Sequence, residues 1–103
     1  MTTRTKTSNT GKRVLDVLKI LRGHSLDGLS NKDIAAALGC PASAVTRATT
    51  DLIEAGLAVK LDNGRFAHSV QMLQIAVAHS REIEKANSRI SELNQRIAAG
   101  AHN

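Results

Sequence analysis

The most marked shortage in this 103-residue chain is of aromatic side chains, which make up 1% of its residues. The sequence has no tryptophan and no tyrosine, and Phe66 is its single phenylalanine. A hydrophobic core therefore has to be built from Leu, Ile, Val and Ala. Leucine and alanine are among the strongest helix formers, so this composition favours a mainly helical fold.

Cysteine and long apolar runs are also scarce. Cys40 is the single cysteine, so no internal disulfide is possible, and such a chain suits a reducing compartment. No apolar run approaches the roughly 20 residues of a membrane span. The first ten residues, MTTRTKTSNT, lack the apolar segment of a secretory signal. These absences predict a soluble, cytoplasmic protein that does not bind membranes.

The residue patterns of an enzyme or a metal site are missing as well. His24, His68, His79 and His102 are scattered without metal-ligand spacing, and no histidine is placed beside Cys40. The sequence has no acid pair, nucleophile constellation or phosphate-binding loop. We therefore expect no cofactor and no metal, and an enzyme is the weakest of the functional alternatives. Partial burial is expected for His68, and a role as a small apolar turn residue for Cys40.

Positive charge, by contrast, is in excess. The chain has 14 Lys and Arg against 9 Asp and Glu, a net charge of +5 and a pI near 10.0. A positive surface potential attracts polyanions, either nucleic acid or anionic membranes, before any specific contact forms. A chain of this length is enough for one domain with a single core.

The pattern along the chain begins with a polar segment and then becomes helical. Residues 1–10 contain Arg4 and Lys6 but no acid, which predicts a flexible basic arm. Residues 11–69 carry the signals of a folded domain. From Gly11 to Gly23, apolar residues recur at spacings of three and four, which predicts a helix. Its expected inward residues are Val14, Leu15, Val17, Leu18 and Leu21.

A helix-turn-helix is predicted between Ser30 and Gly56. Ser30 is expected to cap the first helix, with Asp33 in the acidic position of a capping box. Gly39 suits the end of that helix, and Pro41 suits the first position of the next. Two helices joined by about three residues that include a glycine form this motif. The expected inward residues are Ile34, Ala35 and Leu38 in the first helix, and Val45, Ala48, Leu52 and Ile53 in the second.

Beyond this motif the apolar period changes from helical to two, which predicts a β-hairpin. Asn63-Gly64 is the strongest short hairpin signal. A two-residue turn at this point pairs Leu61 with Phe66 and Asp62 with Arg65. The apolar face of the first strand then consists of Leu57, Val59 and Leu61, which alternate with Ala58 and Lys60. The basic residues Lys60 and Arg65 lie on the outer side.

Helix, helix, turn, helix and basic hairpin follow one another in the order of a winged helix-turn-helix. The predicted fold class is mainly α with a small β-hairpin wing, followed by a long C-terminal helix. Residues 12–70 resemble the N-terminal DNA-binding domain of IclR-type transcriptional regulators in the LGCPASAVTR turn and the AGLAVKLDNGRF wing. The resemblance implies DNA binding by a dimer, with the second helix of the motif in the major groove. The effector domain usual in that family is not expected here, so no small-molecule effector is expected.

The helix that follows Pro41 has the features of a helix whose N-terminal end enters a DNA groove. Its first residues are small and include no carboxylate, so the backbone amides can approach a phosphate. Arg47, one turn further in, is expected to read guanine O6 and N7, and Thr46 and Thr50 are expected to meet thymine methyls or phosphates. The alternative is a solvated helix face. The expected DNA contacts of this helix are Ala42, Ser43, Thr46, Arg47 and Thr50.

Further basic and polar residues are candidates for contacts with the DNA backbone. Asn31 and Lys32 begin the preceding helix and are expected near a phosphate. Lys60 and Arg65 of the wing are expected along an adjacent minor groove; the alternative is a solubilising hairpin edge. Nonspecific contacts are weighed for Arg4, Lys6, Lys12 and Arg13.

The last third of the chain predicts a long helix with two apolar stripes. Residues 71–98 contain neither proline nor glycine, and a heptad seam suits a two-stranded coiled coil between two copies. Val70, Leu73 and Val77 form a second stripe that could dock on the winged domain. The alternative is a helix packed wholly on its own domain. We expect a dimerisation helix over residues 70–98 and a disordered tail over 99–103. The seam consists of Met72, Ala76, His79, Ile83, Ala86, Ile90, Leu93 and Ile97.

Taken together, these patterns favour a homodimeric, sequence-specific regulator of transcription that binds double-stranded DNA and is of bacterial or phage type. The alternative from another class is a winged-helix adaptor. Such an adaptor binds a transcription or replication factor through the same surface or through its coiled coil.

Overall fold

The computed structural model describes residues 9–101, so Arg4 and Lys6 of the expected arm lie outside the described residues. The fold is mainly helical, with a two-stranded antiparallel hairpin and a long C-terminal helix, as the sequence predicts. The chain divides after Met72 into two units, named here the winged unit (residues 9–72) and the α4 extension (residues 73–101). The elements are α1 (Asn9–Ile20), α2 (Asn31–Leu38), α3 (Ala42–Glu54), β1 (Ala58–Lys60), β2 (Phe66–His68) and α4 (Val70–Ala101).

The boundaries of α1, α3 and α4 differ from the expected ones, and α1 ends at Ile20, before Gly23. α1 begins at Asn9, inside the segment expected to be an arm, and asparagine is a favoured residue at helix starts. α4 begins at Val70 as expected but continues to Ala101, because one glycine near a helix end costs only about 1 kcal/mol. Pro41 is the residue that precedes α3 and not its first residue, since its ψ of 151° is extended. Its carbonyl accepts the amides of Ala44 and Val45.

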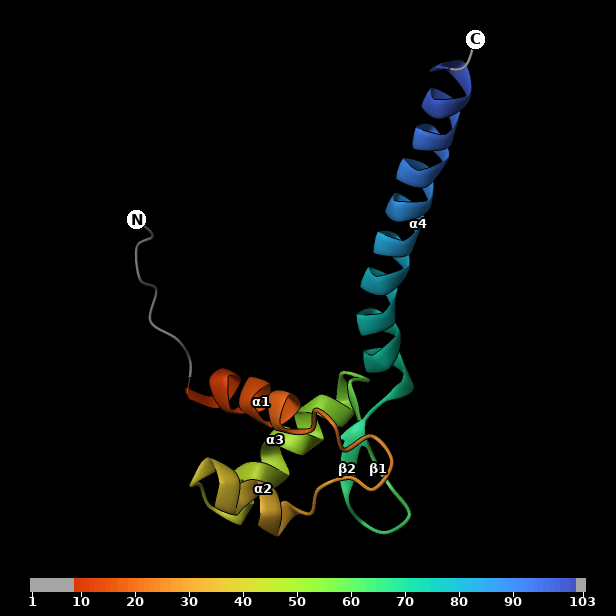
Figure 1. Ribbon diagram of the computed structural model, residues 1–103. Helices are drawn as coiled ribbons and strands as arrows, with labels where there is room; N and C mark the ends of the chain where they lie inside the picture. The colour runs from red at the N-terminus through yellow and green to blue at the C-terminus, as the bar shows by residue number, and fades with distance from the viewer. Residues whose placement is uncertain (1–8, 102–103) are drawn as a thin grey trace, which may run out of the picture. The chain divides into compact units, whose positions relative to one another are not determined.

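The core of the winged unit lies where α3 packs against both α1 and α2 (Figure 1). Leu15, expected to face inward, is 58% exposed. At about 100° per residue, the other four residues expected to face inward from this segment form one arc, and Leu15 lies well outside it. Ile53 of α3 is also outside the core, with 40% of its surface exposed. The buried core residues are Val17, Leu21, Ile34, Val45, Ala48, Leu52, Ala58 and Phe66, with Val14, Leu18, Ala35, Leu38 and Cys40 packed against them.

The turn between α2 and α3 has the geometry that the sequence predicts. The Ser30 hydroxyl accepts the amide of Asp33 at 3.1 Å, which caps α2. Gly39 ends the helix in the left-handed conformation, at φ +64°, and donates its amide to the carbonyl of Ala35. Cys40 also donates to Ala35, at 3.1 Å. The chain is thereby reversed over three residues, and α3 begins against the core.

The wing has a different register from the predicted one. Ala58 pairs with His68, and Lys60 pairs with Phe66. The amide of Leu61 donates to the carbonyl of Arg65 at 2.7 Å, so the loop consists of residues 62–64. The prediction of a two-residue turn, with Leu61 opposite Phe66, was therefore wrong.

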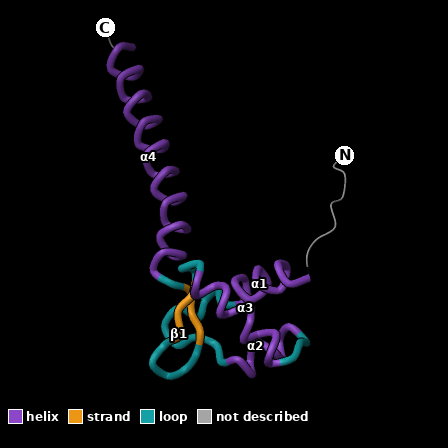
Figure 2. Tube along the Cα trace, turned by 180° about the vertical axis from the view of Figure 1, so that it is seen from behind, coloured by secondary structure: helices purple, strands orange, loops and turns teal. Residues whose placement is uncertain are grey.

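β1 and β2 lie side by side as two short strands (Figure 2). The shift of their pairing by one residue reverses the faces of β1. Ala58 is 2% exposed, whereas Val59, expected on the apolar face, is 38% exposed. A one-residue change of register turns every side chain to the opposite face. Lys60 therefore shares a face with Phe66, and its ammonium nitrogen lies 5.9 Å from the centre of the ring.

Contacts with the loop before α2 explain the register. The backbone of Leu29 exchanges two hydrogen bonds with Phe66, at 2.9 and 2.8 Å, and so pairs with the free edge of β2. The side chain of Asn63 accepts the amide of Arg65 and donates to the carbonyl of Asp27 at 3.1 Å. Gly64, at φ +83°, supplies the left-handed residue that three-residue hairpin loops use.

Ser69 joins the hairpin to α4. Its hydroxyl donates to the carbonyl of Gly56 at 2.6 Å and accepts the amide of Met72 at 3.1 Å. Ser69 is buried, and it caps α4 from inside the winged unit. The preceding residue, His68, is half-buried as expected, and its Nε2 lies 2.7 Å from the carbonyl oxygen of Leu18.

All residues of the α4 extension are exposed. The apolar side chains of its seam include Ile83, Ile90, Leu93 and Ile97, between 48% and 61% exposed. The second stripe, Val70, Leu73 and Val77, is exposed as well. No helix within residues 9–101 combines the length and the apolar character that crossing a membrane requires.

Candidate nucleic-acid interface

The outer face of α3 collects the five contacts that the sequence predicts for this helix. The buried side of the helix carries Val45, Ala48, Thr49 and Leu52. This arrangement follows from the helical period, because residues three and four apart share a face. The five predicted contacts are all exposed: Ala42, Ser43, Thr46, Arg47 and Thr50. Asp51, Ile53 and Glu54, further along the helix, are exposed as well.

The beginning of α3 is open to a negatively charged ligand. Its first turn has no acidic residue, and Pro41 provides no side-chain hydrogen bond as a cap. The first amide groups of a helix have no partner within the helix, and they carry the positive end of the helix dipole. Small side chains at Ala42 and Ser43 leave these amides accessible.

The two threonine hydroxyl groups on this face already donate their protons within the protein. Thr46 donates to the carbonyl of Ala42 at 3.1 Å, and Thr50 donates to the carbonyl of Thr46 at 2.8 Å. A threonine hydroxyl has one hydrogen to donate. The exposed methyl groups are therefore what these two residues can offer to a thymine, together with the remaining oxygen lone pairs.

Asn31 has a different environment from the expected one. Its side-chain nitrogen donates to the carbonyl of Ala42 at 3.2 Å and to the hydroxyl of Thr46 at 3.0 Å. An amide group has two hydrogens, so none remains for a phosphate. Asn31 instead links the start of α2 to the first turn of α3. Its oxygen is buried and has no partner among the described residues.

Lys32 follows Asn31 in α2 and keeps the expected exposed position. Its side chain has no ion-pair partner within residues 9–101. Lys32 is therefore available to a phosphate next to α2, unlike Asn31.

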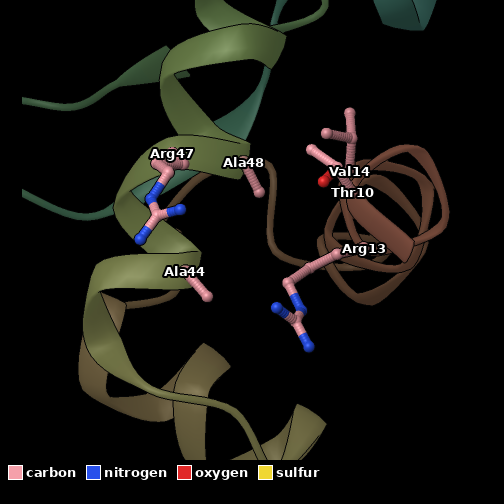
Figure 3. A pocket seen from close by; sticks show the side chains of 6 residues that line it. All are labelled: Thr10, Arg13, Val14, Ala44, Arg47 and Ala48. Carbon is pink, nitrogen blue, oxygen red and sulfur yellow. The ribbon is translucent and has the colours of Figure 1, made fainter. Parts of the chain in front are cut away.

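A small hollow of about 40 Å³ separates the start of α1 from α3 (Figure 3). Arg13 comes from α1 and Arg47 from α3, with Ala44 and Ala48 between them. No acidic residue lines it, and the first turn of α1 has none. Two guanidinium groups without a carboxylate make this hollow electropositive. Its lining consists of Thr10, Arg13, Val14, Ala44, Arg47 and Ala48.

The structure places Arg13 at this hollow beside α3, a position that the sequence alone did not predict. Its basic neighbour Lys12 is paired with Asp16 at 2.9 Å. Arg13 has no such partner among the described residues and is half-exposed. The available signal was its position next to Val14, which packs against the core. Because α1 packs on α3, a residue beside that contact is placed next to α3.

The basic residues of the wing, Lys60 and Arg65, are both exposed. Lys60 extends over the ring of Phe66, a cation–π arrangement that holds a lysine in place. Arg65 lies at the loop and has no ion-pair partner within residues 9–101. Both residues therefore keep their charge available to a polyanion.

The described residues include no group of three or more His, Cys, Asp or Glu side chains that could hold a metal ion. The seam residues of α4 are exposed, except Met72, which is half-buried at the end of the winged unit.

Two comparisons with known proteins give a match. The sequence model of the IclR helix-turn-helix domain matches residues 12–62. A solved structure of a mutant of Lactococcus lactis ZitR is similar, with a TM-score of 0.45 and 20% identity over 93% of this chain. This chain spans 66% of the length of that one. No curated protein sequence matches the chain.

The matched segment contains most of α1, all of α2 and α3 with the turn at Gly39, and β1, but it ends before β2. The match therefore includes the whole exposed face of α3. Through residues 12–62, the chain carries an IclR-type helix-turn-helix domain.

Proposed function

We propose that this protein is a transcriptional regulator that binds a specific double-stranded DNA sequence as a homodimer, in a bacterium or a phage. Helix-turn-helix domains place their second helix in the major groove. The observation that carries the proposal is the α3 tip, which is exposed, uncapped and free of acidic side chains. The same surface has Arg13 and Arg47 on the two sides of an electropositive hollow.

In the proposed complex the residues of this surface have separate tasks. Arg47, one turn into α3, reads guanine, while the methyl groups of Thr46 and Thr50 contact thymine. Arg13 and Lys32 bind phosphates on either side, together with the open amides at Ala42 and Ser43. Asn31 is a positioning residue, because its two hydrogen bonds hold α3 against α2.

The wing adds contacts outside the major groove. Lys60 and Arg65 are exposed on the hairpin and follow the phosphates of the adjacent minor groove in this proposal. The contacts of a positively charged residue with phosphates do not depend on sequence. The wing therefore contributes affinity, and α3 contributes specificity.

The homodimer is proposed from the exposed seam of α4. Soluble proteins rarely leave a continuous apolar stripe of several large side chains in water. Every residue of the α4 extension is exposed, including Ile83, Ile90, Leu93 and Ile97. A second copy of the helix covers such a stripe by coiled-coil packing. Two winged units then read a site of two half-sites.

The exposed seam also supports a second candidate function, that of an adaptor that binds another protein. Such an adaptor binds a transcription or replication factor through the α4 seam and does not bind DNA. The two functions differ in their response to salt, because release of counterions makes duplex binding weaken as salt increases.

A salt titration of duplex binding tests the proposal. Duplexes are first selected from a random pool, and affinity is then measured over a range of salt concentrations. We expect log affinity to fall with log salt by about 0.9 for each phosphate contact. Arg47→Ala is expected to reduce discrimination between the selected and a scrambled duplex by about 1–3 kcal/mol. Arg81→Ala in α4 removes the same charge away from the winged unit and is the matched control.

Binding without salt dependence, or no duplex binding at all, would reject the DNA proposal in favour of the adaptor. Discrimination that survives Arg47→Ala would remove Arg47 from base reading while leaving duplex binding intact.

The neighbours Asn31 and Lys32 provide a second, sharper comparison. Lys32→Ala is expected to lower the salt slope by about one unit and leave stability unchanged. Asn31→Ala is expected to leave the slope unchanged while it lowers stability by about 1 kcal/mol, because it removes two hydrogen bonds inside the protein. Slope measurements and chemical denaturation of both variants decide between these roles. The reverse pattern would indicate that Asn31, and not Lys32, contacts a phosphate.

A further inference from the structure

The seam of α4 has an uneven distribution of side-chain volume. Its residues recur at alternating spacings of four and three, which divides them into two sets of heptad positions. The a positions are Ala76, Ile83, Ile90 and Ile97, and the d positions are Met72, His79, Ala86 and Leu93.

A parallel pair of helices packs this seam poorly. In a parallel pair each seam residue faces the same residue of the other copy. Ala76 and Ala86 then form layers of two small side chains between layers of two large ones. Small layers leave voids that cost stability, because packed cores fill space at uniform density. The two His79 side chains also face each other.

An antiparallel pair removes this unevenness in one register. Each a position then faces a d position, so Ala76 faces the partner's Leu93 and Ala86 faces the partner's Ile83. His79 faces the partner's Ile90 and Met72 faces the partner's Ile97. Both alanines meet a large side chain, and all eight seam residues find a place in this single register.

The charged residues beside the seam fit the same register. Glu82 and Arg89 each directly precede an a position, which makes them g positions, and g positions face each other across an antiparallel pair. Glu82 then meets the partner's Arg89, and Arg89 meets the partner's Glu82. In a parallel pair Glu82 meets the partner's Asn87, and Arg89 meets the partner's Asn94. Within residues 9–101 neither Glu82 nor Arg89 has an ion-pair partner of its own.

We propose that the α4 helices of two copies form an antiparallel coiled coil, with Ala76 opposite the partner's Leu93 and Glu82 paired with the partner's Arg89. This inference rests on the homodimer of the proposed function and adds its orientation and register. Met72 faces the partner's Ile97, 25 positions along the helix. The two points at which the winged units are attached are therefore about 38 Å apart along the coil at 1.5 Å per residue. That is close to one turn of duplex DNA, about 34–36 Å.

Disulfide trapping tests the orientation. Two full-length proteins of different mass carry Ala76→Cys or Leu93→Cys, each with Cys40→Ala, and they are mixed in a glutathione redox buffer. The antiparallel register places residue 93 next to the partner's residue 76, within the 4.4–6.8 Å Cα separation of disulfides. The two Leu93→Cys positions are 17 residues apart, about 26 Å, so they cannot join. We expect the mixed disulfide and none between identical chains.

Each outcome of this experiment has a separate meaning. Disulfides between identical chains indicate a parallel pair and overturn the orientation only. A dimer by light scattering without any disulfide overturns the register. A monomer by light scattering overturns the homodimer of the proposed function, and duplex binding by that monomer is then measured independently.

A charge exchange tests the proposed ion pairs without cysteine. Glu82→Arg places two like charges next to each other at two places in the dimer. We therefore expect the dissociation constant of the dimer to increase about fivefold. Glu82→Arg combined with Arg89→Glu restores opposite charges and is expected to restore the dimer. Equal weakening by the single and double variants would overturn the pairing. Glu84→Arg, at a position away from the seam, is the matched control.

Discussion

The winged unit and the α4 extension contain the same kinds of apolar side chains, but the two regions place them differently. In the winged unit, Leu21, directly after α1, and Ile34, in α2, have no exposed surface. In the α4 extension, Leu93 and Ile97 are more than half exposed. Three short helices and a hairpin can enclose one another's apolar faces, whereas a single helix has no second surface to cover its stripe.

This difference has consequences for stability. Most helical stability in proteins comes from packing of an apolar face and not from intrinsic propensity. α1, α2 and α3 obtain that packing within the winged unit. The exposed residues of the α4 extension have no equivalent packing within the described chain. We therefore expect the two regions to respond differently to substitution, dilution and heating.

The largest expected effect is the loss of the dimer. Ile90→Asp combined with Leu93→Asp places four carboxylates in the centre of the proposed coiled coil, where burial of unpaired charge is very costly. Light scattering should report a monomer, and the helical circular dichroism of α4 should decrease. The winged unit should stay folded. Ser91→Asp combined with Gln95→Asp adds the same charge away from the seam and should leave a dimer. A dimer of the first variant would place the interface elsewhere.

The core of the winged unit should show the next largest effect. Leu21→Ala removes a fully buried side chain and is expected to destabilise the winged unit by about 2–5 kcal/mol. Leu93→Ala makes the same change at an exposed position and should weaken the dimer without altering the unfolding of the winged unit. Urea denaturation followed by NMR signals of the two regions separates these results. Equal effects on the winged unit would mean that the two regions do not differ as described.

Two glycines of the winged unit provide a smaller, matched comparison. Gly28 and Gly23 both have positive φ, +73° and +82°. A Cβ at Gly28 would lie 2.7 Å from the carbonyl oxygen of Phe66, whereas one at Gly23 meets nothing within 4 Å. Gly23→Ala should therefore cost about 1 kcal/mol from backbone strain. Gly28→Ala should cost about 1–3 kcal/mol more from overpacking.

Thermal unfolding of the two alanine variants measures this difference. Equal melting temperatures would show that the close approach of the loop at Gly28 to the wing is not maintained in solution.

The smallest expected effect concerns the boundary between the two regions. Ser69→Ala removes the cap of α4 and a hydrogen bond to the carbonyl of Gly56. We expect a loss of about 1 kcal/mol, seen in the unfolding of the winged unit because Ser69 is buried there. Ser80→Ala, at an exposed position of the α4 extension, should have almost no effect. Hydrogen exchange at the start of α4 provides the measurement.

The helix-turn-helix was predictable because its signals are local. Ser30 caps the helix that it directly precedes, and Gly39 adopts the left-handed conformation that ends it. Both depend on residues no more than four positions away. The exposed face of α3 follows from the helical period in the same way, so Arg47 and Thr50 were correctly placed on the outer face.

The register of the wing was not predictable from Asn63-Gly64 alone. A glycine after asparagine fits both a two-residue and a three-residue loop. Leu29 and Asp27, which bind Phe66 and Asn63, lie more than 35 positions away in the sequence. The side-chain pattern could not decide either, since Ala58 and Val59 are both apolar.

By itself, the sequence determined that this protein has a mainly helical fold, a basic hairpin, an acid-free start of α3 and a continuous heptad seam, because each of these is written in residues that are close together along the chain. Tertiary structure alone decided that the Asn31 side chain donates its hydrogen bonds to α3, that Arg13 and Arg47 line one hollow, and that Ala58 and not Val59 is buried. These features depend on which elements pack side by side, and packing selects one partner for each group from many that are chemically equivalent in the sequence.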